Sequence, residues 1–366
     1  MKLFEFEAKN MLKKYGISVP RGALATSPKQ TEAIARQISK PVVLKSQILV
    51  VGRGKAGGIQ FAENSAQAKK IASSLIGKTI KDCIVRSLLV EEKLDIVKQF
   101  YTSVTVDREA RAFTVLASTE GGVDIEEGAR NHPDKIARHL VDYITGFSQP
   151  QAERILSTFS IDKDDAARLA STLSSLYQVT LDNDAELVEL NPIVKTASGE
   201  FMAADARIII DDNAIFRHPE FEERSLSREE DTLLEAEARR QRLAYVDLSG
   251  DIGIVGNGAG LVMATLDMVN LFGGRPANFL DIGGGGNVEI TKKGILLVMS
   301  KPEVKAILVN VLGGITRCDV VAEAIVQALK EAPVKKPIAV RMVGTNEAEG
   351  KEILSQAGIN AYPEME

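Results

Sequence analysis

The sequence predicts an α+β first half followed by an α/β second half built on a doubly wound parallel sheet. In the second half, four apolar strand candidates alternate with helix-like segments, a pattern typical of right-handed βαβ units. The first half mixes strands and helices without strict alternation. A charged segment at 224–243, rich in Glu and Arg, separates the two patterns and is predicted to be a solvated helix or linker. The domains are therefore expected at residues 1–235 and 236–366.

The composition is ordinary for a globular chain with two or three domains. The 366 residues are 45% hydrophobic and 26% charged, and the net charge of −5 gives no reason to expect nucleic-acid or membrane binding. No apolar run approaches the roughly 18–20 residues that cross a bilayer. The N-terminus lacks the layout of a signal peptide. Only Cys83 and Cys318 occur, far apart, which argues against a disulfide framework and predicts a cytoplasmic protein.

Spacing and capping residues predict the elements of the first half. Leu3–Lys14 has apolar residues at roughly helical spacing and stops before Gly16. Ser27-Pro28 begins a second helix with a capping box and a proline at its first position. Strands are predicted at Pro41–Lys45, Leu88–Glu91, Phe113–Ala117, Leu187–Pro192 and Phe201–Asp205, and charged, leucine-spaced helices over about 133–180.

The second half contains a strand that ends at a glycine turn. Its strand candidates are Ile252–Gly256, Ala277–Ile282, Ala306–Val311 and Pro337–Val343. Gly313-Gly314 ends the third, and a helix-like pattern follows from about Thr316 to Lys330. Such a helix start offers backbone N–H groups and a positive dipole end to a phosphate or carboxylate. No Ser or His with a partnering base lies nearby in sequence, and Cys318 is expected to be buried. The turn is thus predicted to hold an anion that another group carries.

Two motifs of the first half also suit ligands, the first a phosphate group and the second a metal cation. Gly52–Gly58 (GRGKAGG) follows a strand, and its glycines let backbone N–H groups approach phosphates while Lys and Arg add charge. It lacks the Walker spacing, and a flexible basic turn is the alternative. Glu189–Pro192 (ELNP) and Asp205 lie at neighbouring strand ends, where one carboxylate and one amide oxygen suit Mg²⁺. An Asn-Pro turn is the alternative there.

A dinucleotide-like pattern and the histidines carry weaker signals. Gly256–Gly260 follows a strand, and Asp281 lies 21 residues beyond Gly260, but the spacing G-x-G-x-G departs from the dinucleotide fingerprint. Gly283–Gly286 predicts a loop that leaves room for a ligand or partner. The histidines, all in polar contexts, are expected in surface or capping roles: His132, His139 and His218.

Taken together, these motifs resemble the β subunits of succinyl-CoA synthetases (succinate–CoA ligases, ADP-forming), nearly from end to end. The matching blocks are Gly52–Gly58, Ala117–Val123 (ASTEGGV), Glu189–Pro192, Asn257–Leu261 (NGAGL), Pro276–Gly285 (PANFLDIGGG) and Asn310–Asp319 (NVLGGITRCD). The resemblance implies an N-terminal ATP-grasp domain and a C-terminal flavodoxin-like domain that contacts an α subunit. In a heterodimer or heterotetramer, that partner would bind most of the CoA and carry the histidine that becomes phosphorylated.

The resemblance also implies site residues by position. Contacts to ATP/ADP, with GTP/GDP as the alternative, fall on Lys45, Gly52, Arg53, Gly54, Glu91, Leu94 and Gln99. The Mg²⁺ ligands correspond to Asn191 and Asp205. The succinate and phosphate site shared with the α subunit corresponds to Asn257, Gly314, Ile315 and Thr316. Glu189 matches the catalytic acid that meets the phosphohistidine at the nucleotide site.

The chain departs from this family pattern at a few positions. Val51 stands where many relatives have a glycine before Gly52, which predicts a stiffer phosphate-binding turn. Gln99 replaces a frequent glutamate, and the lost charge is predicted to change nucleotide preference or affinity. Pro20 is the residue of many ADP-forming relatives and favours adenine over guanine.

The implied reaction is succinate + CoA + ATP giving succinyl-CoA + ADP + phosphate, through a phosphohistidine and then succinyl phosphate. A malate–CoA ligase β subunit has the same architecture and motifs and is the nearest alternative. An NAD-binding oxidoreductase built on Gly256–Gly260 leaves the first half unexplained. A nucleotide-binding regulatory partner without activity of its own is a third reading.

Overall fold

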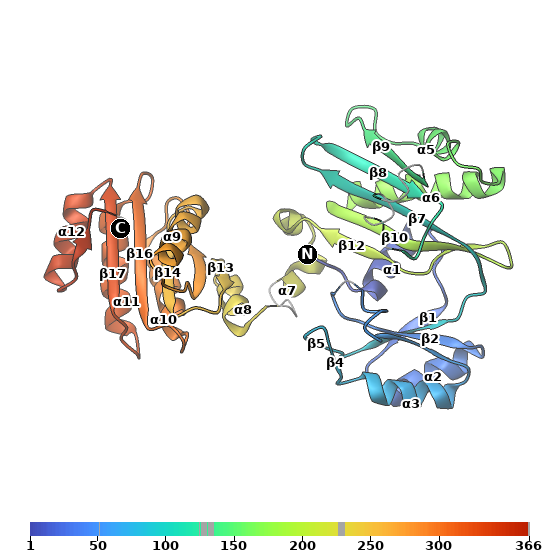
Figure 1. The fold of residues 1–366 in the computed structure, drawn as a ribbon, viewed down its shortest axis with the longest axis horizontal. Helices are drawn as coiled ribbons and strands as arrows, with labels where there is room; N and C mark the ends of the chain where they lie inside the picture. Colours follow the sequence, from blue (N-terminus) through green and yellow to red (C-terminus); the bar gives the residue numbers. More distant parts are fainter. Residues whose placement is uncertain (51, 124, 126–129, 131–134, 226–230, 365–366) are drawn as a thin grey trace. The chain divides into compact units, whose positions relative to one another are not determined.

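The computed structural model describes residues 1–50, 52–123, 125, 130, 135–225 and 231–364, so Val51 and His132 lie outside the described residues. The chain divides into two compact units, Met1–Ser225 and Leu226–Glu366 (Figure 1). The boundary expected after residue 235 falls inside helix α8 (Leu233–Arg240), which the structure places in the second unit. Ala238 packs into that unit's core, and Glu235 accepts a hydrogen bond from Asp247 N at 2.9 Å. No described helix is long and apolar enough to cross a membrane.

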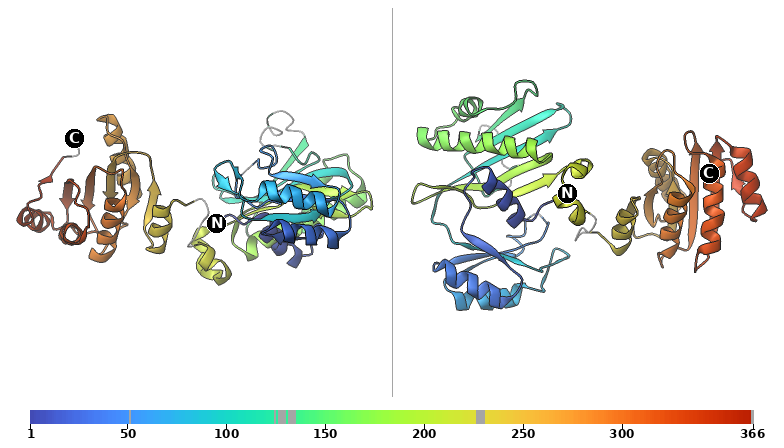
Figure 2. Two further views of the ribbon diagram at one scale, coloured as in Figure 1. Left: turned by 90° about the horizontal axis from the view of Figure 1, so that it is seen from below. Right: turned by 180° about the vertical axis from the view of Figure 1, so that it is seen from behind.

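A small antiparallel sheet begins the first unit, in the strand order β1-β6-β2-β3. Two helices, α2 and α3, cover one face of it (Figures 1 and 2). As predicted, Ser27 caps α2 through Gln30 N, although the Gln30 side chain bonds Thr26 instead of completing the box. The elements are β1 (Gly22–Ala25), α2 (Pro28–Ile38), β2 (Val42–Ser46), β3 (Ile59–Ala62), α3 (Ser65–Leu75), β4 (Thr79–Ile80), β5 (Cys83–Ile84) and β6 (Leu88–Glu92).

A larger antiparallel sheet, in the order β11-β10-β7-β8-β9 with β12 beside β10, completes the first unit. Helices α5 and α6 pack on one of its faces (Figure 2). The elements are α1 (Glu5–Lys14), β7 (Ile96–Asp107), β8 (Ala112–Ser118), β9 (Ile136–Val141), α5 (Gln149–Leu156), α6 (Lys163–Asp182), β10 (Ala185–Thr196), β11 (Phe201–Ala203), β12 (Arg207–Ile210), η2 (Asp212–Arg217), η3 (Pro219–Phe221) and α7 (Glu222–Ser225).

The prediction of helices over the whole of about 133–180 is wrong at its start. Residues 136–141 form β9, which pairs with β8 from Phe113↔Val141 to Ser118↔Ile136. Pairing along the edge of a sheet outweighs local helix propensity there. The strands predicted at Leu187–Pro192 and from Phe201 are confirmed as a hairpin, because β10 and β11 pair on either side of the Ser198-Gly199 turn, where Gly199 adopts φ +84°. The long strand β7 escaped prediction because its sequence mixes polar and apolar residues.

Leu173 tests how the large sheet is stabilised. It lies on α6 and is fully buried in the core against the sheet. Leu173→Ala is expected to lower the free energy of unfolding by about 2–5 kcal/mol, because it removes apolar contacts and leaves a cavity. Chemical denaturation measures the loss, and Leu181→Ala on the exposed side of α6 is the control. A loss below about 1 kcal/mol would contradict this packing.

The second unit is a six-stranded sheet in the order β13-β15-β14-β16-β17-β18, parallel except for edge strand β13. Helix α9 covers one face, and α8, α10, α11 and α12 contribute to the core on the other. The four predicted strands are confirmed, and β13 and β18 add to them. The elements are β13 (Ala244–Asp247), β14 (Ile252–Gly256), α9 (Ala259–Leu271), β15 (Asn278–Asp281), α10 (Val288–Ser300), β16 (Ala306–Gly313), α11 (Cys318–Glu331), β17 (Ile338–Gly344), α12 (Glu347–Gln356) and β18 (Ala361–Tyr362).

Candidate functional site

A row of polar side chains crosses the large sheet of the first unit on the face opposite its core. Strand side chains alternate between faces, and Val188 and Ile208 point into the core. Glu189 therefore lies on the other face, where the register pairs it with Ser103 of β7 and Arg207 of β12. The predicted catalytic Glu189 thus stands in the middle of a three-strand polar row.

Tyr101 and Arg207 flank the Glu189 carboxylate. The Tyr101 hydroxyl lies 3.0 Å from Ser103 Oγ, and Arg207 Nη1 lies 4.0 Å from Glu189 Oε2. Burial, and then the negative charge of Glu189, raise the pKa of Tyr101 above its ordinary value. The Glu189 side chain keeps 15% of its surface exposed. A partly accessible carboxylate is therefore held between a phenol and a guanidinium.

The two predicted Mg²⁺ ligands are brought close together by the β10–β11 hairpin. The carbonyl oxygen of Pro192 accepts hydrogen bonds from Ala204 N at 3.0 Å and Asp205 N at 3.3 Å. This places the Asp205 backbone next to Pro192, the residue that follows Asn191. Asn191 Oδ1 accepts from Gly122 N at 2.8 Å, and 37% of the Asp205 side chain is exposed.

Asn191 and Asp205 fit a magnesium ion chemically. They offer an amide oxygen and a carboxylate, both hard donors, and an amide oxygen keeps a second lone pair beyond the one that accepts from Gly122. Among the described residues, no group of three or more His, Cys, Asp or Glu side chains could hold a metal. A pair of protein ligands agrees with Mg²⁺, which keeps several positions for water and phosphate oxygens.

Six charged side chains, five buried and one partly exposed, form a cluster where α1 meets both sheets of the first unit. We call it the α1 charge cluster; it consists of Glu5, Lys9, Lys45, Arg53, Glu91 and Asp205. Lys45 and Arg53, both predicted phosphate contacts, meet Asp205 in it although they are far apart in sequence. Lys45 belongs to β2, and Arg53 to the glycine-rich loop.

Lys45 and Arg53 share Glu5 as a partner. Lys45 Nζ donates to Glu5 Oε1 at 2.7 Å, and Arg53 Nη2 donates to Glu5 Oε2 and, at 3.1 Å, to Asp205 Oδ1. Burial lowers the pKa of Lys45, but Glu5, Glu91 and Asp205 raise it more, so the net shift is upward. For Glu5, burial raises the pKa, because it disfavours the charged carboxylate. The positive charges of Lys45, Lys9 and Arg53 outweigh burial and bring this pKa well below its ordinary value. Lys45 and Glu5 are therefore both charged.

Glu5 and Lys9 are site residues that sequence reasoning missed, as it missed Tyr101 and Arg207 beside Glu189. Their i, i+4 spacing on a helix is typical of an exposed surface pair. In the structure both are buried, and Lys9 Nζ donates to both oxygens of Glu91 at 2.7 Å. The signal that could have revealed them is the apolar residues around them on α1, such as Ala8 and Leu12, which mark a buried helix face.

Glu91, Leu94 and the glycine-rich loop complete the predicted nucleotide contacts. The Glu91 carboxylate is bound by Lys9 and Lys45, and Leu94 is half-buried. Gly52 adopts φ +74°, which glycine tolerates best. Within the loop, Gly58 N donates to the carbonyl oxygen of Arg53 at 2.8 Å. This bond closes the turn from which Arg53 reaches into the α1 charge cluster.

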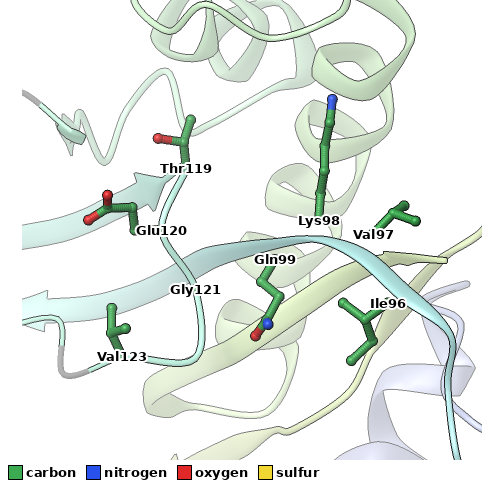
Figure 3. Close-up of a pocket in the computed structure, with 8 residues that line it drawn as sticks. All are labelled: Ile96, Val97, Lys98, Gln99, Thr119, Glu120, Gly121 and Val123. Atoms are coloured by element: carbon green, nitrogen blue, oxygen red, sulfur yellow. The ribbon is translucent and has the colours of Figure 1, made fainter.

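Gln99 lines an open cavity of about 470 Å³ between the start of β7 and the loop after β8 (Figure 3). Figure 3 shows Lys98 and Gln99 on opposite faces of β7, with Lys98 directed toward α6. There Lys98 Nζ donates to Asp165 at 2.9 Å. The loop approaches β7 closely because residue 121 is glycine; a Cβ there would lie 2.4 Å from the Phe100 carbonyl oxygen. Gln99 thus lies on the same face as Tyr101.

The second unit gathers its predicted site residues at the carboxyl edge of its parallel strands. Asn257 Nδ2 donates to Leu312 O at 2.8 Å, and Asn257 Oδ1 accepts from Leu312 N at 2.9 Å. Thr316 Oγ1 accepts from Gly285 N at 3.0 Å. Asp281 Oδ1 accepts from Gly258 N at 2.6 Å and Gly283 N at 2.7 Å. Three side chains therefore fasten the three loops of this edge to one another.

This edge has the features of an anion site. The next two strands in sequence after β14, β15 and β16, lie on opposite sides of it, so the order of strands in the sheet reverses at β14. Ligands bind at such topological switch points in open α/β sheets. Helices α9 and α11 begin here without a side-chain cap, whereas α10 is capped by Asn287. Gly314 has open space around it, and the Ile315 side chain is 85% exposed. The predicted anion-binding turn is therefore accessible.

The weaker candidates have structural partners. Asp281 is bound by loop N–H groups, which gives it a role without any dinucleotide. Cys318 is buried, and burial together with Glu347 raises the pKa of its thiol. His218 Nε2 lies 2.8 Å from Asp184, and His139 packs against Phe147.

Comparison with known proteins covers both units. Residues 2–195 match the ATP-grasp domain model, and residues 255–366 match the CoA-ligase model. The ADP-forming succinate–CoA ligase β subunit of Desulfurococcus amylolyticus is 48% identical over all of this chain and 96% of its own length. The GDP-forming β subunit of Thermus thermophilus is 42% identical over 99% of this chain and 96% of its own length.

A solved structure shows the same fold at lower sequence similarity. ATP citrate lyase from Methanothrix soehngenii, in complex with citrate and coenzyme A, superposes with a TM-score of 0.75 over 99% of this chain and 95% of that chain. Sequence identity is 19%, so this likeness extends to the fold alone. The order of an ATP-grasp unit before a parallel-sheet unit agrees with the architecture predicted from the sequence.

Proposed function

Since the chain belongs to the family of succinate–CoA ligase β subunits, we propose that it works with an α subunit to catalyse succinate + CoA + ATP giving succinyl-CoA + ADP + phosphate. Relatives that match the chain from end to end support this reaction. The proposed partner carries the histidine that is phosphorylated and binds most of the CoA. Malate is the competing acid, because the motifs and the architecture are common to both ligases.

The nucleotide phosphates are proposed to bind at the α1 charge cluster. The observation that carries this assignment is the convergence of Lys45, Arg53 and Asp205 from three separate elements beside Asn191. Lys45 and Arg53 would offset phosphate charge, and Gly52 and Gly54 would let the backbone approach. Asn191 and Asp205 would hold Mg²⁺, which neutralises charge on the phosphates when bound. Gln99, Leu94 and Glu91 are proposed to lie around the base and ribose.

Glu189 is proposed to face the partner's phosphohistidine at this first site. A carboxylate near an imidazole keeps the ring oriented and stabilises its protonated form. Tyr101 and Arg207 hold Glu189 in place for that role. The chain's contribution to phosphoryl transfer is therefore positioning and electrostatic stabilisation, the usual share of the protein in this chemistry.

The second site is proposed at the carboxyl edge of the parallel sheet. Asn257, Gly314, Ile315 and Thr316 would bind succinate and the phosphate carried by the partner. The uncapped starts of α9 and α11 would stabilise negative charge on the phosphohistidine or on succinyl phosphate. The site would be completed by the α subunit. We also propose a cytoplasmic location, supported by the two free cysteines.

Reconstitution tests this function. The chain mixed with a cognate α subunit is expected to form ADP only when succinate and CoA are both present, and neither chain alone is expected to turn over. Malate in place of succinate separates the two acids, and GTP in place of ATP separates the nucleotides; Pro20 and the ADP-forming relatives favour ATP. Turnover by the isolated chain, or none by the mixture, would contradict the proposal.

A further inference from the structure

Glu5 lies between the two cations that are proposed to bind nucleotide phosphates. Its carboxylate is only 2% exposed and divides its oxygens between them, with Oε1 accepting from Lys45 and Oε2 from Arg53. Lys9 also approaches Oε1, at 2.8 Å. The carboxylate therefore occupies the kind of position, between an ammonium and a guanidinium, that a phosphate group takes.

The donors of Lys45 are fully used in this arrangement. An ammonium group has three N–H bonds. Lys45 Nζ contacts Glu5 at 2.7 Å, Glu91 at 2.9 Å and the carbonyl oxygen of Ala204. A phosphate oxygen can bind Lys45 only by replacing one of these three acceptors.

Glu5 is the acceptor best placed to be replaced. After Lys45 and Arg53 turn to phosphate oxygens, Glu5 keeps Lys9 as a partner at 2.8 Å, so its buried charge is not left unpaired. Glu91 touches only one of the two proposed phosphate-binding cations, whereas Glu5 touches both. Replacing Glu5 would therefore free more donors for a polyphosphate.

The net charge of the cluster points the same way. Three cations (Lys9, Lys45, Arg53) face three carboxylates (Glu5, Glu91, Asp205), so the cluster is neutral when all six are ionised. A neutral cluster has no net attraction for a polyanion. Neutralising Glu5 alone would leave one positive charge in excess beside the proposed phosphate position.

We propose that Glu5 sets the nucleotide affinity of this chain by competing, as an internal carboxylate, with the nucleotide phosphates for Lys45 and Arg53. The proposal rests on the nucleotide site proposed above. It makes α1, which no sequence motif marked, part of that site, with Glu5 as a positioning residue.

Glu5→Gln tests the competition with an isosteric side chain that has no charge. By calorimetry on the full chain, the variant is expected to bind Mg-ADP roughly tenfold more tightly than the wild type. Its unfolding temperature is expected to fall, because the buried cations lose a compensating charge. A merely structural role would lower affinity and stability together, so the opposite signs identify competition. Inorganic tripolyphosphate, which has no base or ribose, is expected to show the same gain.

Glu92→Gln is the matched control. Glu92 is also a buried carboxylate on β6, but it pairs with Arg21 at 3.0 Å, away from Lys45 and Arg53. This variant is expected to lose stability without any change in Mg-ADP affinity. A gain in affinity equal to that of Glu5→Gln would overturn the proposal, because it would show a general effect of removing a negative charge from the chain.

The remaining outcomes distinguish a failure of the proposed nucleotide site from a failure of the proposed competition. If the wild-type chain does not bind Mg-ADP, the proposed nucleotide site itself fails. If the wild type binds and Glu5→Gln binds equally or more weakly, the competition is refuted and the nucleotide site stands. Should Glu5→Gln not fold, Glu5→Asp replaces it; its side chain is too short to bridge both cations, so tighter binding than wild type supports the proposal and unchanged or weaker binding refutes it.

Discussion

Asp205→Asn is expected to reduce ADP formation by the reconstituted enzyme roughly 10²–10³-fold, the loss typical of removing one electrostatic contact to a reacting phosphate. Asp205 is proposed as the only charged Mg²⁺ ligand from this chain, and it also pairs with Arg53 at 3.1 Å. The amide keeps the shape of the side chain but removes the charge from both interactions. Labelling of the partner histidine from γ-labelled ATP measures the effect directly.

The reverse half-reaction supplies the internal control for Asp205→Asn. Succinyl-CoA and phosphate phosphorylate the partner histidine without nucleotide, so the variant is expected to keep that labelling. Asp182→Asn, on an exposed carboxylate at the end of α6, is the matched variant and should behave as wild type in both assays. Wild-type labelling of Asp205→Asn from ATP would rule out the magnesium assignment.

Asn257→Asp is expected to have the opposite pattern. The aspartate loses the N–H that donates to Leu312 O at 2.8 Å, and it places a negative charge beside the proposed succinate and phosphate position. We expect a loss of roughly 10²-fold in labelling from succinyl-CoA and phosphate, because both the loop geometry and the charge are disturbed. Labelling from ATP is expected to continue, because that step uses the first unit.

The control for Asn257→Asp is the same substitution at the other end of α9. Asn270 is exposed there and lies away from the loops of the carboxyl edge. Asn270→Asp should leave both labelling reactions unchanged. If Asn257→Asp reduced labelling from ATP as strongly as labelling from succinyl-CoA, the assignment of separate sites to the two units would be refuted.

Much of the second unit was predictable because its information is local. Apolar runs of strand length, each followed by a helical pattern, identified four strands, and Gly313-Gly314 marked the turn into α11. The family resemblance assigned Asn257, Gly314 and Thr316 to one site, and the carboxyl ends of parallel strands share the edge where the structure gathers them. The local pattern could not predict the two hydrogen bonds that Asp281 accepts, because they form only where loops from different strands meet.

The first unit was harder to predict because its sheet is antiparallel and its strands pair over long distances in sequence. Strand β7 was not recognised, so neither Tyr101 nor the row around Glu189 was predicted. Residues 136–141 were expected to be helical and form β9. The ELNP motif and Asp205 were expected at neighbouring strand ends, and the β10–β11 hairpin places them so because both flank a single turn.

The sequence by itself determined the family, the order of the two units and the residues proposed to bind phosphate, because these are carried by short motifs and by periodicity along the chain. Only the tertiary structure showed that the buried Glu5 and Lys9 join Lys45, Arg53 and Asp205 in one cluster. In the sequence, an i, i+4 ion pair has the same spacing whether its helix face is exposed or buried. Whether such a pair belongs to a binding site depends on the charged side chains that other elements place around it. Packing between distant segments of the chain decides which side chains these are.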